Sequence, residues 1–333
     1  MGEIEDVFKE CNRFELITGH KSRKNIGLYQ KLGYKKFKTE KLTENLNLVY
    51  LEKINKRSKI MAKIGFIGYG SMGSMIIKGL ISSNVLKPDE IVISTRTKSK
   101  LADIKKKYPE IEITDNNVYL ARKCGKIFLF VGTSAVKEAI EEIKGELSED
   151  SHITYIAAAL TIANVESIFP GKITKVIPSL TSEVNEGVSL IHHNEKVTEK
   201  DADLVNNLFN SISSIKIIHE EDFEVGADLT SCSPAFIAEI FMKFAESSAK
   251  NSNFTPREAE DMIIRTLYGT AKLLYENKMN FEDVISRVAT KGGITEEGIK
   301  ILENDLPAIF NDLFKTTLDK HEKIKEKLDE QFS

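Results

Sequence analysis

A glycine-rich turn, Gly-Tyr-Gly-Ser-Met-Gly at residues 68–73, ends an apolar run at residues 63–68. Only glycine lets a strand turn so tightly while bare backbone N–H groups approach a pyrophosphate at a helix N-terminus. An amphipathic pattern at residues 71–83 and a second apolar run at 91–94 complete the strand, helix and strand of a dinucleotide-binding unit. The alternative is a glycine-rich turn that binds nothing. The residues predicted to contact the pyrophosphate are Gly68, Gly70, Ser71, Met72 and Gly73.

The end of the second apolar run indicates which dinucleotide is preferred. A site selective for NAD usually places Asp or Glu there to accept from the ribose 2′-hydroxyl, but residues 94–100 contain no carboxylate. Hydroxyl and cationic side chains instead donate to a 2′-phosphate and offset its charge, which favours NADPH. The alternative is a solvated basic loop. The predicted contacts are Ser94, Arg96, Thr97 and Lys98.

The composition, with 41% hydrophobic and 29% charged residues in 333, is typical of a globular protein with two ordinary domains. Because the net charge is −3, we expect no nucleic-acid partner. No apolar run reaches the roughly 18 to 20 residues of a membrane span, and the N-terminus is acidic where a signal peptide is basic. We therefore expect a cytoplasmic protein without a membrane partner. The cysteines and histidines are scattered, so we expect no metal site.

Three regions follow one another along the chain. Apolar strands alternate with helical patterns over residues 61–222, which predicts a parallel, doubly wound α/β sheet of the Rossmann type. Residues 223–333 are predicted to be all helical, and residues 1–60 to form a short α/β appendage before Met61, the expected natural start. The predicted strands are 63–68, 91–94, 127–131, 153–158, 174–178, 188–193 and 215–219, and the predicted helices between them are 71–83, 98–107, 135–144, 161–168 and 200–212.

The helical region has apolar stripes that need a partner. Residues 236–245 show the spacing of a buried helix face, and residues 255–258 form a capping box with Pro256 at the first helical position. Because three or four helices of this size bury little on their own, we infer self-association through these helices, as a dimer or a larger assembly. The charged residues 319–330 are expected to form a solvated final helix.

Several motifs in residues 61–333 resemble those of pyrroline-5-carboxylate reductases, in the same order and spacing. The spellings at 176–179, 231–236 and 291–300 look closest to the late-competence, or ComER-type, branch of that family. The segments that carry the resemblance are 66–73, 156–159, 177–181, 231–236 and 290–295.

This resemblance implies that the cyclic imine Δ1-pyrroline-5-carboxylate is reduced to proline by hydride from NADPH. Gly292 and Gly293 can present N–H groups to the substrate carboxylate at the start of a helix. Thr295 matches the threonine that bonds the imine nitrogen in the family, and it is the predicted catalytic residue; the alternative is a simple helix N-cap. Further substrate contacts are implied for Thr290 and Ser179, and further cofactor contacts for Val131, Gly132, Thr133, Ala157 and Ala158.

Departures from the family pattern leave two alternatives open. Gly132 and Thr133 stand where the family commonly has Lys and Pro, and Ser179 and Thr181 replace Asn and Pro. The chain could be an NADPH-dependent reductase of another small imine or oxo acid, or a non-catalytic NADPH-binding accessory or regulatory protein of the competence-associated kind. Carbonyl reduction is disfavoured because residues 231–237 lack the Gly-x-Gly-x-x-x-Lys pattern of related hydroxyacid dehydrogenases.

Residues 14–53 resemble the C-terminal end of a GCN5-type N-acetyltransferase. The likeness rests on Thr18-Gly19-His20, Leu32-Gly33-Tyr34 and a closing strand at residues 47–51. The glycine-containing loop that holds the acetyl-CoA pyrophosphate in that family is missing from residues 1–60. We therefore expect no acetyltransferase activity.

Overall fold

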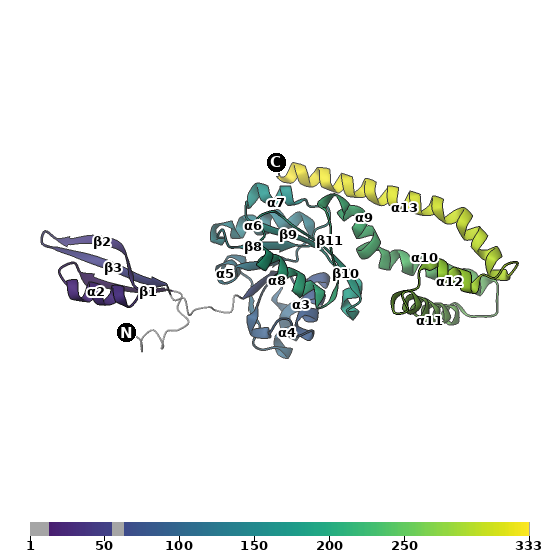
Figure 1. Ribbon diagram of the computed structural model, residues 1–333, viewed down its shortest axis with the longest axis horizontal. Coiled ribbons are helices and arrows are strands. Elements are labelled where there is room, and N and C mark those ends of the chain that lie inside the picture. Colours follow the sequence, from purple (N-terminus) through teal and green to yellow (C-terminus); the bar gives the residue numbers. More distant parts are fainter. Residues whose placement is uncertain (1–12, 55–62, 333) are drawn as a thin grey trace. The chain divides into compact units, whose positions relative to one another are not determined.

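The structure, a computed structural model, describes residues 13–54 and 63–332. It divides into two compact units, Met1–Lys63 and Ile64–Ser333, each of which is described by itself (Figure 1). No helix within the described ranges is long and apolar enough to cross a membrane.

The first unit is a three-stranded antiparallel sheet with one helix. Its strands lie in the order β1-β3-β2. The core is small, with Tyr34, Val49 and Leu51 buried against a few partly buried neighbours. Every residue of β2 is exposed. The elements are β1 (Arg13–Gly19), α2 (Arg23–Lys31), β2 (Lys35–Thr43) and β3 (Leu46–Ile54).

The second unit begins with an eight-stranded sheet in the order β11-β10-β9-β8-β7-β4-β5-β6, which confirms the expected Rossmann-type fold. Successive side chains of a strand point to opposite faces, and helices cover both faces (Figure 1). The strands are β4 (Ile64–Ile67), β5 (Ile91–Ser94), β6 (Glu112–Thr114), β7 (Lys126–Leu129), β8 (His152–Tyr155), β9 (Lys172–Ile177), β10 (Gly187–His193) and β11 (Ser213–Ile217).

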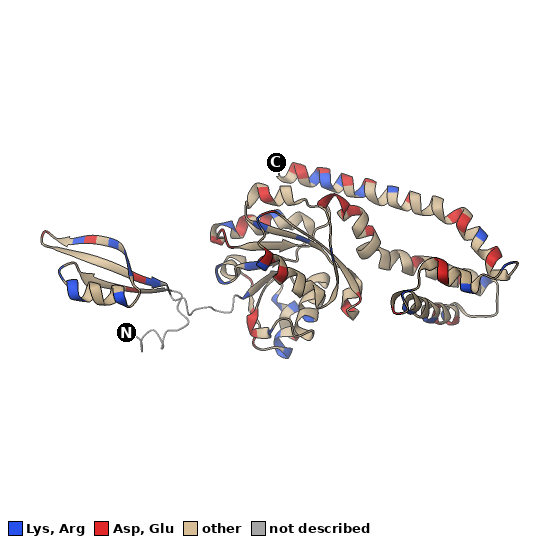
Figure 2. Ribbon diagram, viewed as in Figure 1, with Lys and Arg blue, Asp and Glu red and all other residues tan. Residues whose placement is uncertain are grey.

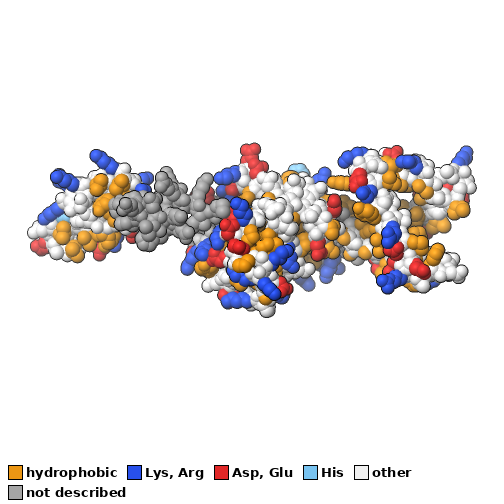
Figure 3. Space-filling model, turned by 90° about the horizontal axis from the view of Figure 1, so that it is seen from below, with side chains coloured by type: hydrophobic (Ala, Val, Ile, Leu, Met, Phe, Trp, Pro, Cys, Tyr) orange, Lys and Arg blue, Asp and Glu red, His pale blue; other side chains and the backbone are white. Residues whose placement is uncertain are grey.

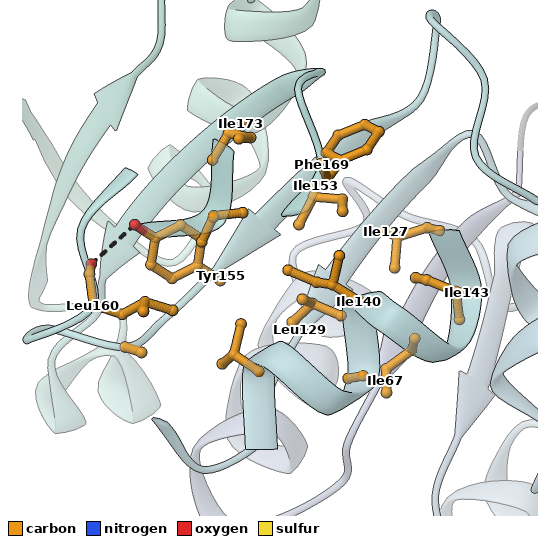
Figure 4. Close-up of a cluster of buried hydrophobic side chains, with 14 of the residues drawn as sticks. Ile67, Ile127, Leu129, Ile140, Ile143, Ile153, Tyr155, Leu160, Phe169 and Ile173 are labelled. Atoms are coloured by element: carbon orange, nitrogen blue, oxygen red, sulfur yellow. Dashed lines mark hydrogen bonds between the residues drawn. The ribbon is translucent and has the colours of Figure 1, made fainter. Parts of the chain in front are cut away.

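Two groups of helices bury the two faces of this sheet. One face packs on α3 (Ser71–Ser82), α4 (Ala102–Lys107) and α8 (Glu199–Asn210). The other packs on α5 (Asn117–Lys123), α6 (Val136–Ile143) and α7 (Ile162–Ile168). Figure 4 shows the second group, where isoleucines of β7, β8 and β9 meet those of α6. Within it the Tyr155 hydroxyl donates to the Leu160 carbonyl at 3.0 Å, so this buried phenol is satisfied.

The expectation of a wholly parallel sheet was wrong at one edge. β10 runs antiparallel to β9, and β11 runs parallel to β10. Residues 178–186 alone connect β9 to β10. A parallel crossover needs about a dozen residues or more, so this short connection forces the chain to reverse direction.

β6 and α5 were not predicted from the sequence. A three-residue strand with polar ends, Glu112 and Thr114, gives almost no periodic signal. The helix is short, and it begins where the Asn116 side chain accepts a hydrogen bond from the Tyr119 N–H at 2.8 Å.

A helical arm follows the sheet, as expected. The predicted capping box is present, because Thr255 and Glu258 bond each other's backbone N–H groups at the start of α11. The elements are α9 (Phe223–Ala227), a π-helical turn (Asp228–Cys232), α10 (Ser233–Lys250), α11 (Pro256–Tyr275), α12 (Phe281–Val288) and α13 (Ile294–Phe332).

The final helix is more than a solvated segment. α13 runs back along the arm to the sheet domain, where it contacts α7 and α9 (Figure 1). Charged residues of both signs recur along α13 (Figure 2), but Leu328 and Phe332 are buried in the sheet core, with Ile324 partly buried beside them. The expected solvated helix is therefore corrected: every fourth residue is apolar, and this narrow stripe packs on α7.

An ion-paired aspartate and a buried histidine lie near the N-terminal ends of β7, β8 and β9. The Lys126 and Lys172 ammonium groups donate to the Asp201 carboxylate at the start of α8. Burial raises the pKa of Asp201, but the hydrogen bonds from both lysines outweigh it and leave the pKa well below its usual value. Nearby, the His152 Nε2 atom lies 2.7 Å from the Thr174 hydroxyl. Burial, with the charge of Lys126, lowers the pKa of His152 to about 3.

The neutral state of His152 predicts a pH dependence of stability. An unfolded histidine binds a proton below about pH 6.5, whereas folded His152 does so only near pH 3, so stability falls as the pH drops between these values. We expect His152→Gln to remove about 1.4 kcal/mol per pH unit from the slope of unfolding free energy between about pH 4.5 and 5.5. Urea unfolding at several pH values measures this slope. The exposed His219→Gln is the control, and an unchanged slope in His152→Gln would contradict the prediction.

Candidate functional site

In the turn between β4 and α3, two glycines lie so close to Phe130 that a side chain would not fit. Gly68 has φ +105°, and a Cβ atom there would lie 2.3 Å from the Phe130 carbonyl oxygen. A Cβ on Gly73 would lie 2.9 Å from the Phe130 Cβ. Gly70, in contrast, has open space around it and is the N-cap of α3 without any side-chain cap. The first N–H groups of α3 therefore lack a side-chain acceptor at the N-cap and suit a phosphate.

A pocket of about 380 Å³ opens beside this turn, at the C-terminal ends of β4, β5 and β7. It brings together seven of the predicted cofactor residues: Gly68, Gly70, Ser94, Arg96, Thr97, Val131 and Gly132. Seven others do not line it: Ser71, Met72, Gly73, Lys98, Thr133, Ala157 and Ala158. Ser71 and Met72 line a neighbouring hollow between α3 and α4.

The basic loop after β5 contributes Arg96 and Lys100 to this pocket. Arg96 is exposed and has no ion-pair partner among the described residues, so its guanidinium is available to a ligand. Lys98 does not line the pocket, and it pairs at 2.8 Å with Asp115, which does. Lys100 was not among the predicted contacts, although it lies in the same basic run.

A chain of hydrogen bonds forms one wall of the pocket. The Ser94 hydroxyl donates to the Asn117 Oδ1 atom at 2.6 Å, and the Asn117 amide donates to Glu142 at 2.6 Å. Ser94 is buried, and its hydroxyl proton is already engaged in the hydrogen bond to Asn117. Asn117 and Asp115 were not predicted, because both follow the short strand β6, which has no periodic pattern.

The predicted substrate loop has a different environment. Gly292 has φ +74°, and its N–H donates to the Glu296 carboxylate at 2.6 Å. The Gly293 N–H donates to the Thr290 carbonyl at 2.9 Å. α13 begins at Ile294, so Thr295 is its second residue, and the N-cap interpretation of Thr295 was wrong. The loop already binds one carboxylate, that of Glu296.

The two halves of the predicted site do not meet within one chain. The 290–295 loop lies at the far end of the arm in Figure 1, and none of its residues lines the nucleotide pocket. Ser179 is buried near the sheet, where its hydroxyl lies 2.9 Å from that of Thr181. Ala158 packs with Ile177 and Phe223. Within one chain, the predicted substrate loop is therefore separate from the nucleotide pocket.

Two family models match the chain. Residues 220–324 match the model described as pyrroline-5-carboxylate reductase dimerisation, and residues 63–158 match the model described as NADP oxidoreductase coenzyme F420-dependent. A curated relative, pyrroline-5-carboxylate reductase 3 of Bacillus subtilis, is 37% identical over 272 residues, which cover 81% of this chain and 100% of that protein. The chain belongs to the pyrroline-5-carboxylate reductase family.

One further relative and one solved structure are also similar to this reductase family member. ComE operon protein 4 of Bacillus subtilis is 29% identical over 270 residues, which cover 81% of this chain and 99% of that protein. The solved structure of a pyrroline-5-carboxylate reductase from Coxiella burnetii has a TM-score of 0.71 and 26% identity, and the match covers 80% of this chain and 98% of that one. The expected family is thus confirmed, whereas placement in the late-competence branch stays a prediction.

The match to the dimerisation family accounts for the exposed apolar surface of the helical arm. Large hydrophobic side chains are exposed along α10 to α13, and they show as orange patches on the arm in Figure 3. Removing such side chains from water favours association. Self-association through the arm follows from the family match and from this exposed surface. Examples are Phe244, Ile264, Tyr268, Phe281, Val288 and Ile301.

A pair of substitutions tests the turn. Gly68→Ala must move the Phe130 backbone and adopt a left-handed conformation, so we expect it to lower the free energy of unfolding by about 2 to 4 kcal/mol. Gly70→Ala meets no atom within 4 Å, so it should cost at most about 1 kcal/mol, the usual loss when alanine occupies an N-cap position. Denaturant unfolding of both variants measures the difference. Equal losses would show that the turn tolerates a side chain at residue 68.

Proposed function

We propose that this protein reduces the cyclic imine Δ1-pyrroline-5-carboxylate to proline with NADPH. The observation that carries the proposal is the 37% identity to a pyrroline-5-carboxylate reductase along that protein's whole length. A spectrophotometric assay at the NADPH absorbance band, with pyrroline-5-carboxylate as substrate, tests it directly. Turnover only with other imines or oxo acids would reassign the substrate.

The residues around the glycine turn fit an NADP cofactor. Gly70 leaves room for a pyrophosphate at the start of α3, and the pocket continues to Arg96, whose cation and five donors suit a 2′-phosphate. Residues 63–158 match a model whose description names NADP. When bound, the cofactor supplies the hydride.

The 290–295 loop supplies the substrate contacts in this proposal. The backbone N–H of Gly292 already holds the Glu296 carboxylate, which supports its use as a carboxylate donor group. The substrate carboxylate would take the place of Glu296 there. Thr295, exposed and without a hydrogen bond of its own among the described side chains, would hold the imine nitrogen as it takes up a proton. An iminium accepts hydride readily, so orientation supplies most of the catalysis.

The loop and the nucleotide pocket would come from different subunits. The loop lies at the end of the arm, and the arm exposes the apolar surface that association would bury. We propose that a second copy of the chain places its own 290–295 loop over the pocket beside Gly70. A dimer through the arms provides two such sites.

One relative and four residues support a second candidate function. ComE operon protein 4 resembles the chain at 29% identity, and Gly132, Thr133, Ser179 and Thr181 depart from the reductase pattern. The chain would then bind NADPH as an accessory or regulatory protein. Tight NADPH binding without turnover of any imine or oxo acid would favour this reading.

Selectivity for NADPH is expected to depend on Arg96. Arg96→Ala removes the one guanidinium in the pocket, so the KM for NADPH should rise about tenfold or more while that for NADH changes little. Lys98→Ala is the matched comparison and should act less, because its ammonium is paired with Asp115. An unchanged preference in Arg96→Ala would remove that residue from the 2′-phosphate site.

Thr295→Ala should lower kcat by about 10²-fold and leave the Kd for NADPH unchanged within about twofold, because the threonine meets only the reacting ring. Steady-state kinetics and NADPH titration measure both values. Equal losses in kcat and in NADPH affinity would indicate a structural role.

Mixing two inactive variants tests whether the site is shared. Gly70→Asp places a carboxylate where the pyrophosphate is expected, and Thr295→Ala removes the hydroxyl. If each site draws on two subunits, reassociated mixtures should regain up to about a quarter of wild-type activity, since half of the dimers carry one intact site. No recovery after verified subunit exchange would place both residues in one subunit's site.

A further inference from the structure

A second pocket, of about 650 Å³, lies between β9, the 219–225 segment and the last part of α13. None of its residues lines the nucleotide pocket or belongs to the 290–295 loop. It is thus separate from the site already described. Its charged and imidazole side chains are Lys175, Lys325, His219, His321, Glu220, Glu221, Glu224 and Glu322.

Lys175 is the unusual feature of this pocket. It comes from the middle of β9 and is only 1% exposed. Its ammonium lies 3.6 Å from a Glu220 oxygen, beyond hydrogen-bond distance, and 4.5 Å from the centre of the Phe223 ring. That Glu220 oxygen already accepts the Ile162 N–H at 2.7 Å. The ammonium is thus ion-paired with Glu220 at a long distance, and the described residues offer its three N–H groups no acceptor at shorter range.

Burial lowers the pKa of Lys175, and the carboxylates of Glu220 and Glu224 act against this change. An additional anion next to the ammonium would add to its interaction with Glu220 and stabilise the charged form.

A second polar group in the pocket wall lacks a hydrogen-bond partner. The His321 Nδ1 atom is buried without a hydrogen bond, while its Nε2 atom lies 4.0 Å from the Asp228 carboxylate. The other oxygen of Asp228 accepts from the Thr317 hydroxyl. The polar groups between α9 and α13 are therefore incompletely satisfied by the protein.

The charges lining the pocket select among small ligands. Two lysines face four glutamates, so a dianion such as phosphate would be repelled from the rim. A simple cation would bring Lys175 no additional anion. A molecule with one carboxylate and one ammonium group satisfies both signs, and the pocket volume holds a molecule of amino-acid size.

We propose that this pocket binds a zwitterionic α-amino acid, with its carboxylate on Lys175 and Lys325 and its ammonium group toward Glu224 and Glu322. The choice of L-proline as the first probe rests on the proposed function, whereas the site itself does not. L-alanine and L-glutamate are the probes that do not depend on it.

Calorimetric titration of the full chain, without nucleotide, tests the site. L-proline should bind to the wild-type protein and to Thr295→Ala with affinities equal within about twofold, and Lys175→Met should weaken it about tenfold or more. Lys325→Gln, at the partly exposed rim, should weaken it several-fold and does not risk the core. Lys323→Gln, an exposed residue of α13 outside the pocket, should have no effect. Cyclopentanecarboxylate and pyrrolidine, which each keep only one of the two charges, should bind more weakly than L-proline.

Three results would overturn the proposal. The first is no binding of any of the three amino acids at millimolar concentration. The second is equal binding to the wild-type protein and to folded Lys175→Met and Lys325→Gln. The third is binding that Thr295→Ala abolishes and Lys175→Met keeps, which would place the amino acid in the reductase site. The imine assay reports on the proposed function separately, since turnover does not depend on this pocket.

Discussion

The close approach of the β4–α3 turn to the Phe130 backbone is the constraint on which the nucleotide site depends. No side chain fits between Gly68 and the Phe130 carbonyl, and Gly73 lets the first turn of α3 pack on the same residue. This contact aligns the ends of β4 and β7 and directs the N-terminus of α3 at the pocket. Gly70 is free of such packing, so the fold does not require its lack of a side chain, which fits the predicted contact with a pyrophosphate.

The helical arm separates two parts of the chemistry. The sheet domain carries the nucleotide pocket, whereas the substrate loop lies at the start of α13, at the end of the arm (Figure 1). α13 then returns to the sheet domain and anchors there through Leu328 and Phe332. One helix thus connects the loop, the unusual pocket around Lys175 and the core of the sheet. In the function that we propose, association through the apolar arm surface would bring the loop of one chain to the pocket of another.

Much of the fold was predictable because buried strands and amphipathic helices leave a clear period in the sequence. The order of β4, α3 and β5 and the capping box at Thr255 follow from local rules and were confirmed. β6 was missed because three residues carry no period. The predicted direction of β10 was wrong because hydrophobic periodicity carries no information about strand orientation. The short 178–186 connection decides that orientation. The prediction for α13 was incomplete because its many charged residues obscure the apolar residue at every fourth position, which packs on α7.

The sequence by itself determined the family, the glycine turn and the absence of a carboxylate after β5, since each depends on residue types at short spacing. Only the tertiary structure decided which of the predicted residues share a pocket, for example that Arg96 and Lys100 line it while Lys98 pairs with Asp115. It also brought Lys175 of β9 together with His321 and Lys325 of α13. These residues are far apart along the chain, and their meeting is set by how α13 packs on the sheet domain, a long-range contact that no local pattern encodes.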